Sequence, residues 1–288
     1  MSLRTSSVLI SLEITQWTAR KLDRAAGREL CESKSAQTDA ARVNKVLINP
    51  KHLKPIARIV NSARNFHYAN TLPWEKKGAD ILPSAMYFEY MPKIGELRNT
   101  FHNMVNEFVN DLPTMIEQRE RELGEMFNPD EYPTAHQVRD KFSFEIEMNP
   151  IPTSSDFRVD IPDQELEEHK KNLTERMEAA NKAAEHELFA RMYQLVAKVV
   201  MTLIDPGKIF RNTLILNPME LARKASKMNV NNNADINKLA TELDTLCSKV
   251  TIDALRDEEQ YKYRKDTAAL FQNMLTDIEN AYNRSINQ

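Results

Sequence analysis

Residues 163–203 carry the longest regular hydrophobic pattern in the chain, without a proline or glycine. Apolar positions recur every three, four or seven residues, which predicts one continuous helix of roughly 60 Å. Its first half is polar with a narrow apolar seam, whereas residues 188–203 are apolar on several faces. We therefore expect a projecting arm followed by a buried half. The positions expected to pair with a partner helix are Leu166, Leu173, Met177, Ala180, Ala184 and Leu188.

A second long helical pattern begins at Pro92, again with apolar steps of three and four. Pro113 lacks an amide hydrogen, so we expect a kink or break near residues 111–112. Between the two long helices, the period changes to two at residues 142–148 and 157–161, which predicts a β-hairpin. The simplest arrangement is a long antiparallel helical or coiled-coil hairpin that carries the β-hairpin between its helices.

The two ends of the chain add shorter elements. Residues 7–15 read as a strand, followed by a basic helix over residues 17–28. Asn49-Pro50 starts another helix, with the asparagine as its cap. Thr134 and Gln137 occupy capping-box positions of a short helix. Beyond the long helix, we expect helices at about 217–228, 235–248 and 252–283.

These elements predict a mainly α-helical fold with a small β element. We divide the chain into residues 1–91, with the N-terminal strand and basic helices, residues 92–204, with the long helical hairpin and the β-hairpin at about 142–161, and residues 205–288, with C-terminal helices that pack on the body. At 288 residues, the chain is long enough to bury a substantial core.

Composition narrows the function classes. Only five glycines are present, so phosphate-binding loops and doubly wound sheets, which depend on glycine, are not expected. Cys31 and Cys247 have no metal-type spacing and are expected to be reduced and partly buried. His169 and His186 lie seventeen residues apart, whereas a zinc-protease helix needs two histidines at i and i+4. We therefore expect no catalytic residues, metal site or cofactor, and no enzyme activity.

Charge is distributed unevenly. Residues 1–64 carry twelve Lys or Arg against five Asp or Glu, while residues 111–190 carry nine against twenty. The basic N-terminal helices could neutralise phosphates, and nearby aromatic side chains could stack on bases. Solvated helix faces and small core anchors explain the same residues equally well. The candidate nucleic-acid-binding residues are Arg20, Lys21, Arg24, Arg28, Lys51, Lys54, Arg58 and Arg64.

Several short landmarks carry a resemblance: Trp17-Thr18-Ala19-Arg20-Lys21, Leu72-Pro73-Trp74, Leu97-Arg98-Asn99-Thr100-Phe101, Asp156-Phe157-Arg158-Val159 and Phe210-Arg211-Asn212-Thr213. Together with the order of elements, they resemble an uncharacterised bacteriophage and prophage family known only as a domain of unknown function. Genes of that family often lie near genes for MoxR-type AAA+ ATPases and von Willebrand A-type proteins. The resemblance implies a partner or adaptor of such a system, and it transfers no functional residue.

We therefore expect a non-enzymatic phage protein that acts through protein–protein contacts, as a homo-oligomer or as an accessory of an AAA+ ATPase. One alternative is a single-stranded DNA- or RNA-binding protein of phage recombination or replication. Another is an inhibitor of a host defence factor, which the sequence does not separate from the first. No run is long and apolar enough to span a membrane, and we expect the protein in the cytoplasm of the bacterial host.

Overall fold

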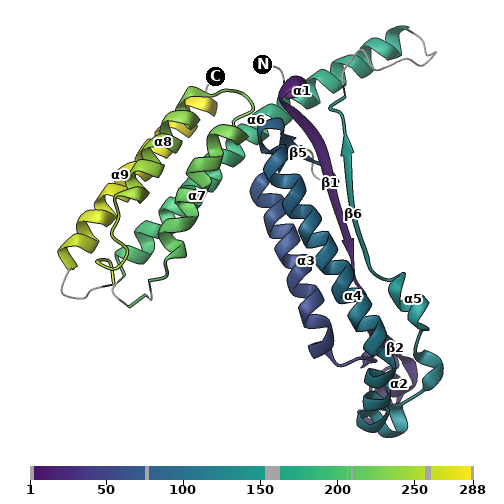
Figure 1. Cartoon of the computed structure of the whole chain (residues 1–288). Helices are drawn as coiled ribbons and strands as arrows, with labels where there is room; N and C mark the ends of the chain where they lie inside the picture. The colour runs from purple at the N-terminus through teal and green to yellow at the C-terminus, as the bar shows by residue number, and fades with distance from the viewer. Residues whose placement is uncertain are drawn as a thin grey trace. The chain divides into compact units, whose positions relative to one another are not determined.

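A computed structural model describes residues 3–74, 78–152, 163–205, 207–208, 210–256 and 261–286. The chain forms two compact units, each built from segments that are far apart in the sequence. Unit 1 comprises residues 1–11, 70–88 and 148–288, and unit 2 comprises residues 12–69 and 89–147. Helices dominate, with a small antiparallel sheet, so the predicted mainly α fold with a small β element is confirmed (Figure 1).

Four strands form the larger sheet, in the order β4-β5-β1-β6. Their bounds are β1 Ser7–Thr15, β4 Leu72–Pro73, β5 Asp80–Pro83 and β6 Ser143–Asn149. The predicted first strand is confirmed over its full length. It pairs antiparallel with β5, with Ser7 opposite Pro83 and Ile10 opposite Asp80. Ile10, Ile81 and Leu82 are fully buried, so this sheet is anchored by apolar packing.

Unit 1 contains a four-helix bundle. Each helix contacts the next along the chain, and the last returns to the first. Short connections between consecutive helices favour antiparallel neighbours, as in up-down-up-down bundles. The interior holds large apolar side chains such as Phe189, Met192 and Phe271. The four helices are α6 Asp163–Leu203, α7 Thr213–Met228, α8 Ala234–Ser248 and α9 Tyr261–Ile286; α1 Leu3–Ser6 and the 3-10 turn η1 Ser84–Met86 also belong to unit 1.

Helix α6 is the single long helix that the sequence predicts, and its bounds are confirmed. Its antiparallel neighbour within unit 1 is α9. At one end, Arg264 of α9 contacts the backbone of Leu203, and at the other, the rings of His186 and Tyr282 lie 5.2 Å apart. The expected partner, the helix that contains Pro113, lies in unit 2. Within unit 1, the long antiparallel neighbour of α6 is therefore α9 and not that helix.

Unit 2 is built around two antiparallel helices, α3 and most of α4, which run side by side in Figure 1. Phe66 of α3 stacks on Tyr90 of α4, and the His67 ring forms a 2.6 Å hydrogen bond with the same tyrosine hydroxyl. The elements of unit 2 are β2 Arg20–Asp23, α2 Arg24–Ser33, β3 Val43–Val46, α3 Pro50–Asn70, most of α4 Tyr87–Leu123, η2 Gly124–Met126, η3 Pro129–Glu131 and α5 Ala135–Arg139.

One local prediction is wrong, and the structure excludes one of the two outcomes of another. The basic helix expected over residues 17–28 is divided, because residues 20–23 form β2 and pair with β3, with Arg20 opposite Val46. The Asp23 side chain then caps α2 by accepting from the Ala26 amide. Of the two outcomes expected near residues 111–112, a kink or a break, the break is absent, since α4 continues through Pro113. Buried Leu112 and Met115 on either side supply packing that offsets the lost hydrogen bond.

Other local predictions are confirmed or lie outside the described residues. Thr134 and Gln137 form the expected capping box of α5. The first strand of the predicted hairpin is present as β6, which lies beside β1, while residues 153–162 fall outside the description. The last helix was expected from residue 252, but residues 252–256 form turns and α9 begins at Tyr261.

A buried lysine connects three segments of unit 2. The Lys45 ammonium lies 3.0 Å from Asp23 Oδ2 and 2.9 Å from Glu131 Oε2, with only 6% of its side chain exposed. Burial alone lowers the pKa of Lys45, but the hydrogen bonds to Glu131 and Asp23 outweigh it and the pKa is raised. The Ala26 amide and Lys45 lower the pKa of Asp23. The ion cluster thus joins β2, β3 and η3.

We expect Lys45→Met to lower the free energy of unfolding by about 3 kcal/mol, because it leaves the partly buried Asp23 carboxylate without its cation and Glu131 with only the more distant Lys21. Urea denaturation followed by circular dichroism measures the change. Lys21→Met is the matched control. That lysine lies 3.9 Å from the same Glu131, but 49% of its side chain is exposed, so the loss should stay below about 1 kcal/mol. Equal losses in both variants would contradict this account of the cluster.

Candidate functional site

Helix α6 presents an apolar strip to solvent, which we call the α6 face. Its five residues are spaced by three or four, so they share one side of the helix. Tyr193 and Met201 have 37% and 58% of their area exposed, and Ile204, just past the helix end, has 65%. Ala190 and Ala197 are half-buried. No charged residue interrupts the strip. The residues of the α6 face are Ala190, Tyr193, Ala197, Met201 and Ile204.

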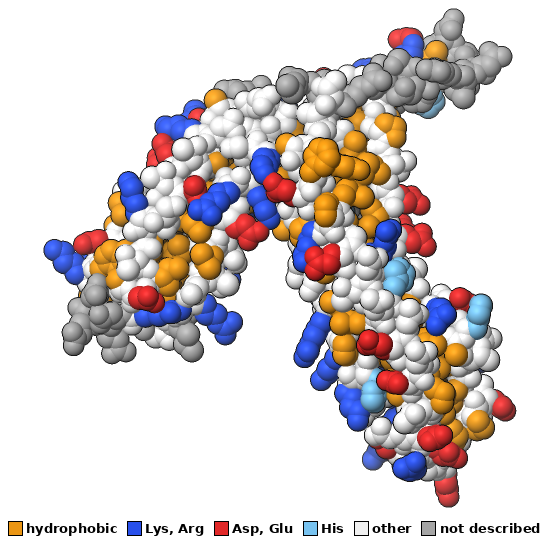
Figure 2. Space-filling view, in the orientation of Figure 1, with side chains coloured by type: hydrophobic (Ala, Val, Ile, Leu, Met, Phe, Trp, Pro, Cys, Tyr) orange, Lys and Arg blue, Asp and Glu red, His pale blue; other side chains and the backbone are white. Residues whose placement is uncertain are grey.

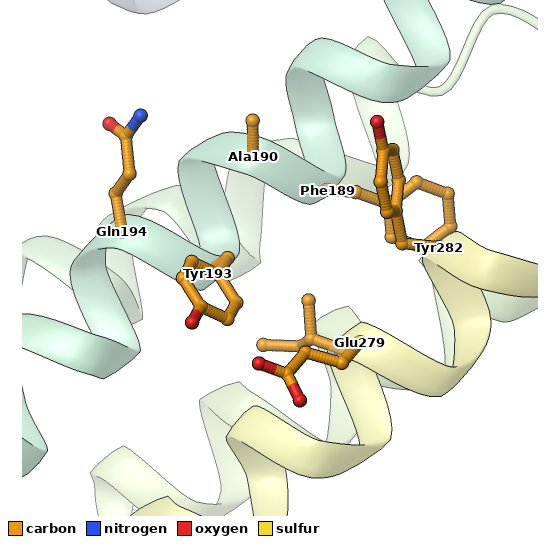
Figure 3. Close-up of a pocket in the computed structure, with 7 residues that line it drawn as sticks. Phe189, Ala190, Tyr193, Gln194, Glu279 and Tyr282 are labelled. Carbon is orange, nitrogen blue, oxygen red and sulfur yellow. The ribbon is translucent and has the colours of Figure 1, made fainter.

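A groove runs between the α6 face and α9 (Figure 3). It has a volume of about 350 Å³ and is lined by Phe189, Ala190, Tyr193, Gln194, Ile278, Glu279 and Tyr282. Most of these groups are apolar or aromatic. The Tyr193 hydroxyl points across the groove and donates to the Glu279 carboxylate, and this interaction raises the pKa of Tyr193. The groove can therefore accept an apolar side chain beside one acidic group.

Arg264 fixes the end of α6 that carries Met201 and Ile204. Its guanidinium donates to three backbone carbonyls, those of Thr202 at 2.8 Å, Leu203 at 2.8 Å and Asp205 at 2.6 Å. The last carbonyls of a helix have no partner within it, and a basic side chain can satisfy them. Because Arg264 belongs to α9, this contact sets the register between α6 and α9 at the α6 face.

The seam predicted as a protein-contact surface lies largely inward. Leu173, Ala180, Ala184 and Leu188 are buried, and Leu166 and Met177 are half-buried. In unit 1, α6 packs against α7, α9 and β4. The sequence analysis missed the α6 face because residues 188–203 are apolar on several sides. The steps of three and four from Ala190 to Ile204 were visible, but nothing local distinguished the inner side from the outer one.

The eight basic candidates all lie in unit 2. Arg20, Lys21, Arg24, Arg28, Lys51, Lys54, Arg58 and Arg64 are exposed. On α3, Lys51, Lys54 and Arg58 share one side of the helix, and Lys and Arg side chains line the edge of unit 2 along which α3 runs (Figure 2). Arg64 instead donates to the Ile14 carbonyl at 3.0 Å, so it supports the fold.

The proposed stacking residues are mainly structural. Trp74 and His67 are buried, Phe66 stacks on Tyr90, and Trp17 makes an edge contact with Phe108 at 6.4 Å. Tyr68 is exposed. These aromatic side chains therefore act chiefly as core anchors.

Arg24 and Arg28 line a cleft of about 560 Å³ in unit 2, together with Arg42, which the sequence analysis did not single out. Asp23 and Asp39 also line it. The cleft thus gathers three guanidinium groups, which suit phosphate oxygens, beside two carboxylates.

The described residues contain neither a candidate metal site nor a candidate membrane span. No group of three or more His, Cys, Asp or Glu side chains is placed to hold a metal ion. No described helix is both long enough and apolar enough to cross a membrane. Both cysteines are buried and free, and burial raises the pKa of Cys247 to about 12.

Comparisons with known proteins gave one match. The model of a family described as "Protein of unknown function (DUF3150)" matches residues 5–203, from within α1 to the last residue of α6. No curated protein and no solved structure matched the chain.

We expect Arg264→Met to lower the free energy of unfolding by about 2 kcal/mol, because three carbonyls lose a charged donor. Hydrogen exchange should accelerate at the C-terminal end of α6 in the same variant. Lys262→Met, which changes an exposed residue two positions earlier, is the control and should leave both quantities unchanged. Unchanged exchange in Arg264→Met would show that α9 does not hold this end of α6.

Proposed function

The chain belongs to the DUF3150 family, and we propose that it acts through protein–protein interaction and not through catalysis. It would serve as a self-assembling protein or as an accessory component of a MoxR-type AAA+ system in a phage. The α6 face carries this proposal. Three large apolar side chains are exposed along one side of one helix, beside a groove that can receive further apolar groups.

The physical reason for a contact surface is the cost of exposing such a strip to water. Burying an apolar side chain contributes roughly 1.5–3 kcal/mol. Single exposed apolar residues are ordinary, whereas a row of them next to an apolar groove favours an interaction site. The rigid bundle beneath holds the strip in place, so little conformational entropy is lost when a partner binds.

Two kinds of partner fit this surface. A second copy of the chain is one. The other is an AAA+ ATPase, which the resemblance to the phage and prophage family implies through neighbouring genes. Both associations use the same physical chemistry, so a substitution on the α6 face tests them together.

We expect Met201→Glu to reduce association at least tenfold, because a carboxylate would be placed in an apolar contact. Analytical ultracentrifugation measures self-association, and co-purification with a co-expressed MoxR-type ATPase measures the second partner. Lys198→Glu is the control, since this exposed residue lies on another side of α6. If wild type shows neither association, or if Met201→Glu retains both, the proposal is wrong.

A second candidate function, binding of single-stranded DNA or RNA, rests on the cleft that contains Arg24, Arg28 and Arg42. The two carboxylates beside them reduce the net positive charge, so the α6 face remains the stronger observation.

For this second candidate, replacing Arg24, Arg28 and Arg42 by Gln should lower the affinity for single-stranded DNA at least tenfold at low salt. The slope of log affinity against log salt should fall by about 2, since each lost phosphate contact contributes roughly 0.7. Fluorescence anisotropy at several salt concentrations provides both values. An unchanged slope would remove the cleft as a nucleic-acid site.

A further inference from the structure

We propose that the partner of the α6 face is a second copy of this chain, with the two α6 helices antiparallel around a two-fold axis at Ala197. This inference rests on the proposed function, because it names what covers the same surface. A two-fold contact requires a self-complementary surface, in which residue i meets residue j and residue j meets residue i. The spacing, the groove and the charges of unit 1 each satisfy that requirement.

The spacing is symmetric about Ala197. Tyr193 and Met201 lie four residues before and after it, and Ala190 and Ile204 lie seven residues before and after it. In an antiparallel pair centred on Ala197, the partner's Met201 therefore meets Tyr193, and the partner's Ile204 meets Ala190. Ala197 lies at the centre of the contact, and Ala190 lies opposite the partner's Ile204. Small residues at these two positions allow the two helices to approach closely.

The position of the groove fits the same two-fold arrangement. Its α6 wall contains Ala190 and Tyr193, the two residues that meet the partner's Ile204 and Met201. Those two side chains are the most exposed apolar groups of the α6 face. Each copy thus offers two projecting side chains at one end of the strip and a groove of about 350 Å³ at the other. The two-fold axis places the projecting end of each copy on the groove of the other.

Two charged residues of α9 are also placed symmetrically about the level of Ala197. Arg264 contacts Leu203, Tyr193 contacts Glu279, and His186 contacts Tyr282, so Ala197 lies level with about residues 270–275 of α9. Gln272 is midway between Lys265 and Glu279, which are both exposed and lie fourteen residues apart on nearly the same side of α9.

The two-fold axis lies between the two α6 helices, in the plane of their contact and perpendicular to both. It therefore brings the two α9 helices together on one side of the α6 pair. Lys265 of each copy then lies level with Glu279 of the other. Two opposite-charge pairs result, whereas in a parallel pair the two α9 helices would lie on opposite sides and form no such pairs. Charge complementarity therefore favours the antiparallel second copy over an unrelated apolar segment.

The surface is small for a permanent interface. The strip from Ala190 to Ile204 is about 21 Å long. Stable complexes usually bury roughly 1,200 Å² or more, and a strip of this length with one helix flank is short for such an interface. We therefore expect a reversible dimer whose dissociation constant is in the micromolar range, and sedimentation should be measured from about 1 to 500 μM.

Cysteine cross-linking tests the axis directly. Ala197 of one copy meets Ala197 of the other, so Ala197→Cys should form a disulfide-linked dimer under mild oxidation. Lys198→Cys, one residue away on another side of α6, should form at least tenfold less of the disulfide-linked dimer. Wild-type protein supplies the background, and its two buried thiols should contribute little.

A charge exchange provides an independent test. Lys265→Glu and Glu279→Lys should each weaken the dimer about fivefold, since each creates like-charge pairs across the axis. The double variant restores opposite charges and should return the dissociation constant to within about twofold of the wild-type value. Glu279→Lys also removes the Tyr193 contact within one copy, and the double variant does not restore it, so recovery isolates the contact between copies.

The outcomes separate this inference from the proposed function. Cross-linking at Ala197 together with charge rescue supports the two-fold dimer. A monomer at all concentrations that still binds the ATPase through Met201 would overturn the dimer and leave the proposed function intact. A dimer without cross-linking at Ala197 or without charge rescue would overturn this geometry. Loss of every association through the α6 face would overturn both.

Discussion

The antiparallel packing of α9 on α6 is the contact on which unit 1 depends. Without it, the C-terminal half of α6 would expose Phe189, Met192 and Val196, which are buried in the bundle. Arg264 fixes the register by donating to carbonyls at the end of α6. A long helix with apolar residues on several sides needs neighbours on several sides, and α7 and α9 each cover one.

The α6 face is what remains after those two neighbours have packed. A four-helix bundle covers the inner side of each helix and leaves an outer side, which is usually polar. On α6 the outer side carries Tyr193, Met201 and Ile204. Since charged residues make up 28% of the chain, polar residues were available for this side, and a purely structural requirement does not explain the apolar ones.

Elements that depend on nearby residues could be predicted from the sequence. The absence of proline and glycine defined α6, alternation defined β1, and the pair Thr134 and Gln137 defined the start of α5. Elements that depend on distant partners could not. Strand β2 exists because β3 pairs with it from about twenty residues later, and α9 was not identified as the neighbour of α6.

The candidate site shows the same division. The basic residues were identified individually, but their grouping with Arg42 depends on how α2 meets the segment that follows it. On α6, an inner apolar side cannot be separated from an outer one by sequence alone, and positions predicted to form the contact surface, such as Ala184 and Leu188, are buried. Which side faces solvent is decided only when α7 and α9 are in place.

The residues that contribute apolar area and those that contribute charge come from different parts of the chain. Four of the five residues of the α6 face lie within the family match, whereas Ile204, Lys265 and Glu279 lie beyond it. Coiled coils show a similar separation of roles: an apolar seam supplies affinity, and flanking charges select the partner and its orientation. In the proposed dimer, α6 would supply the contact area and α9 would select an antiparallel second copy.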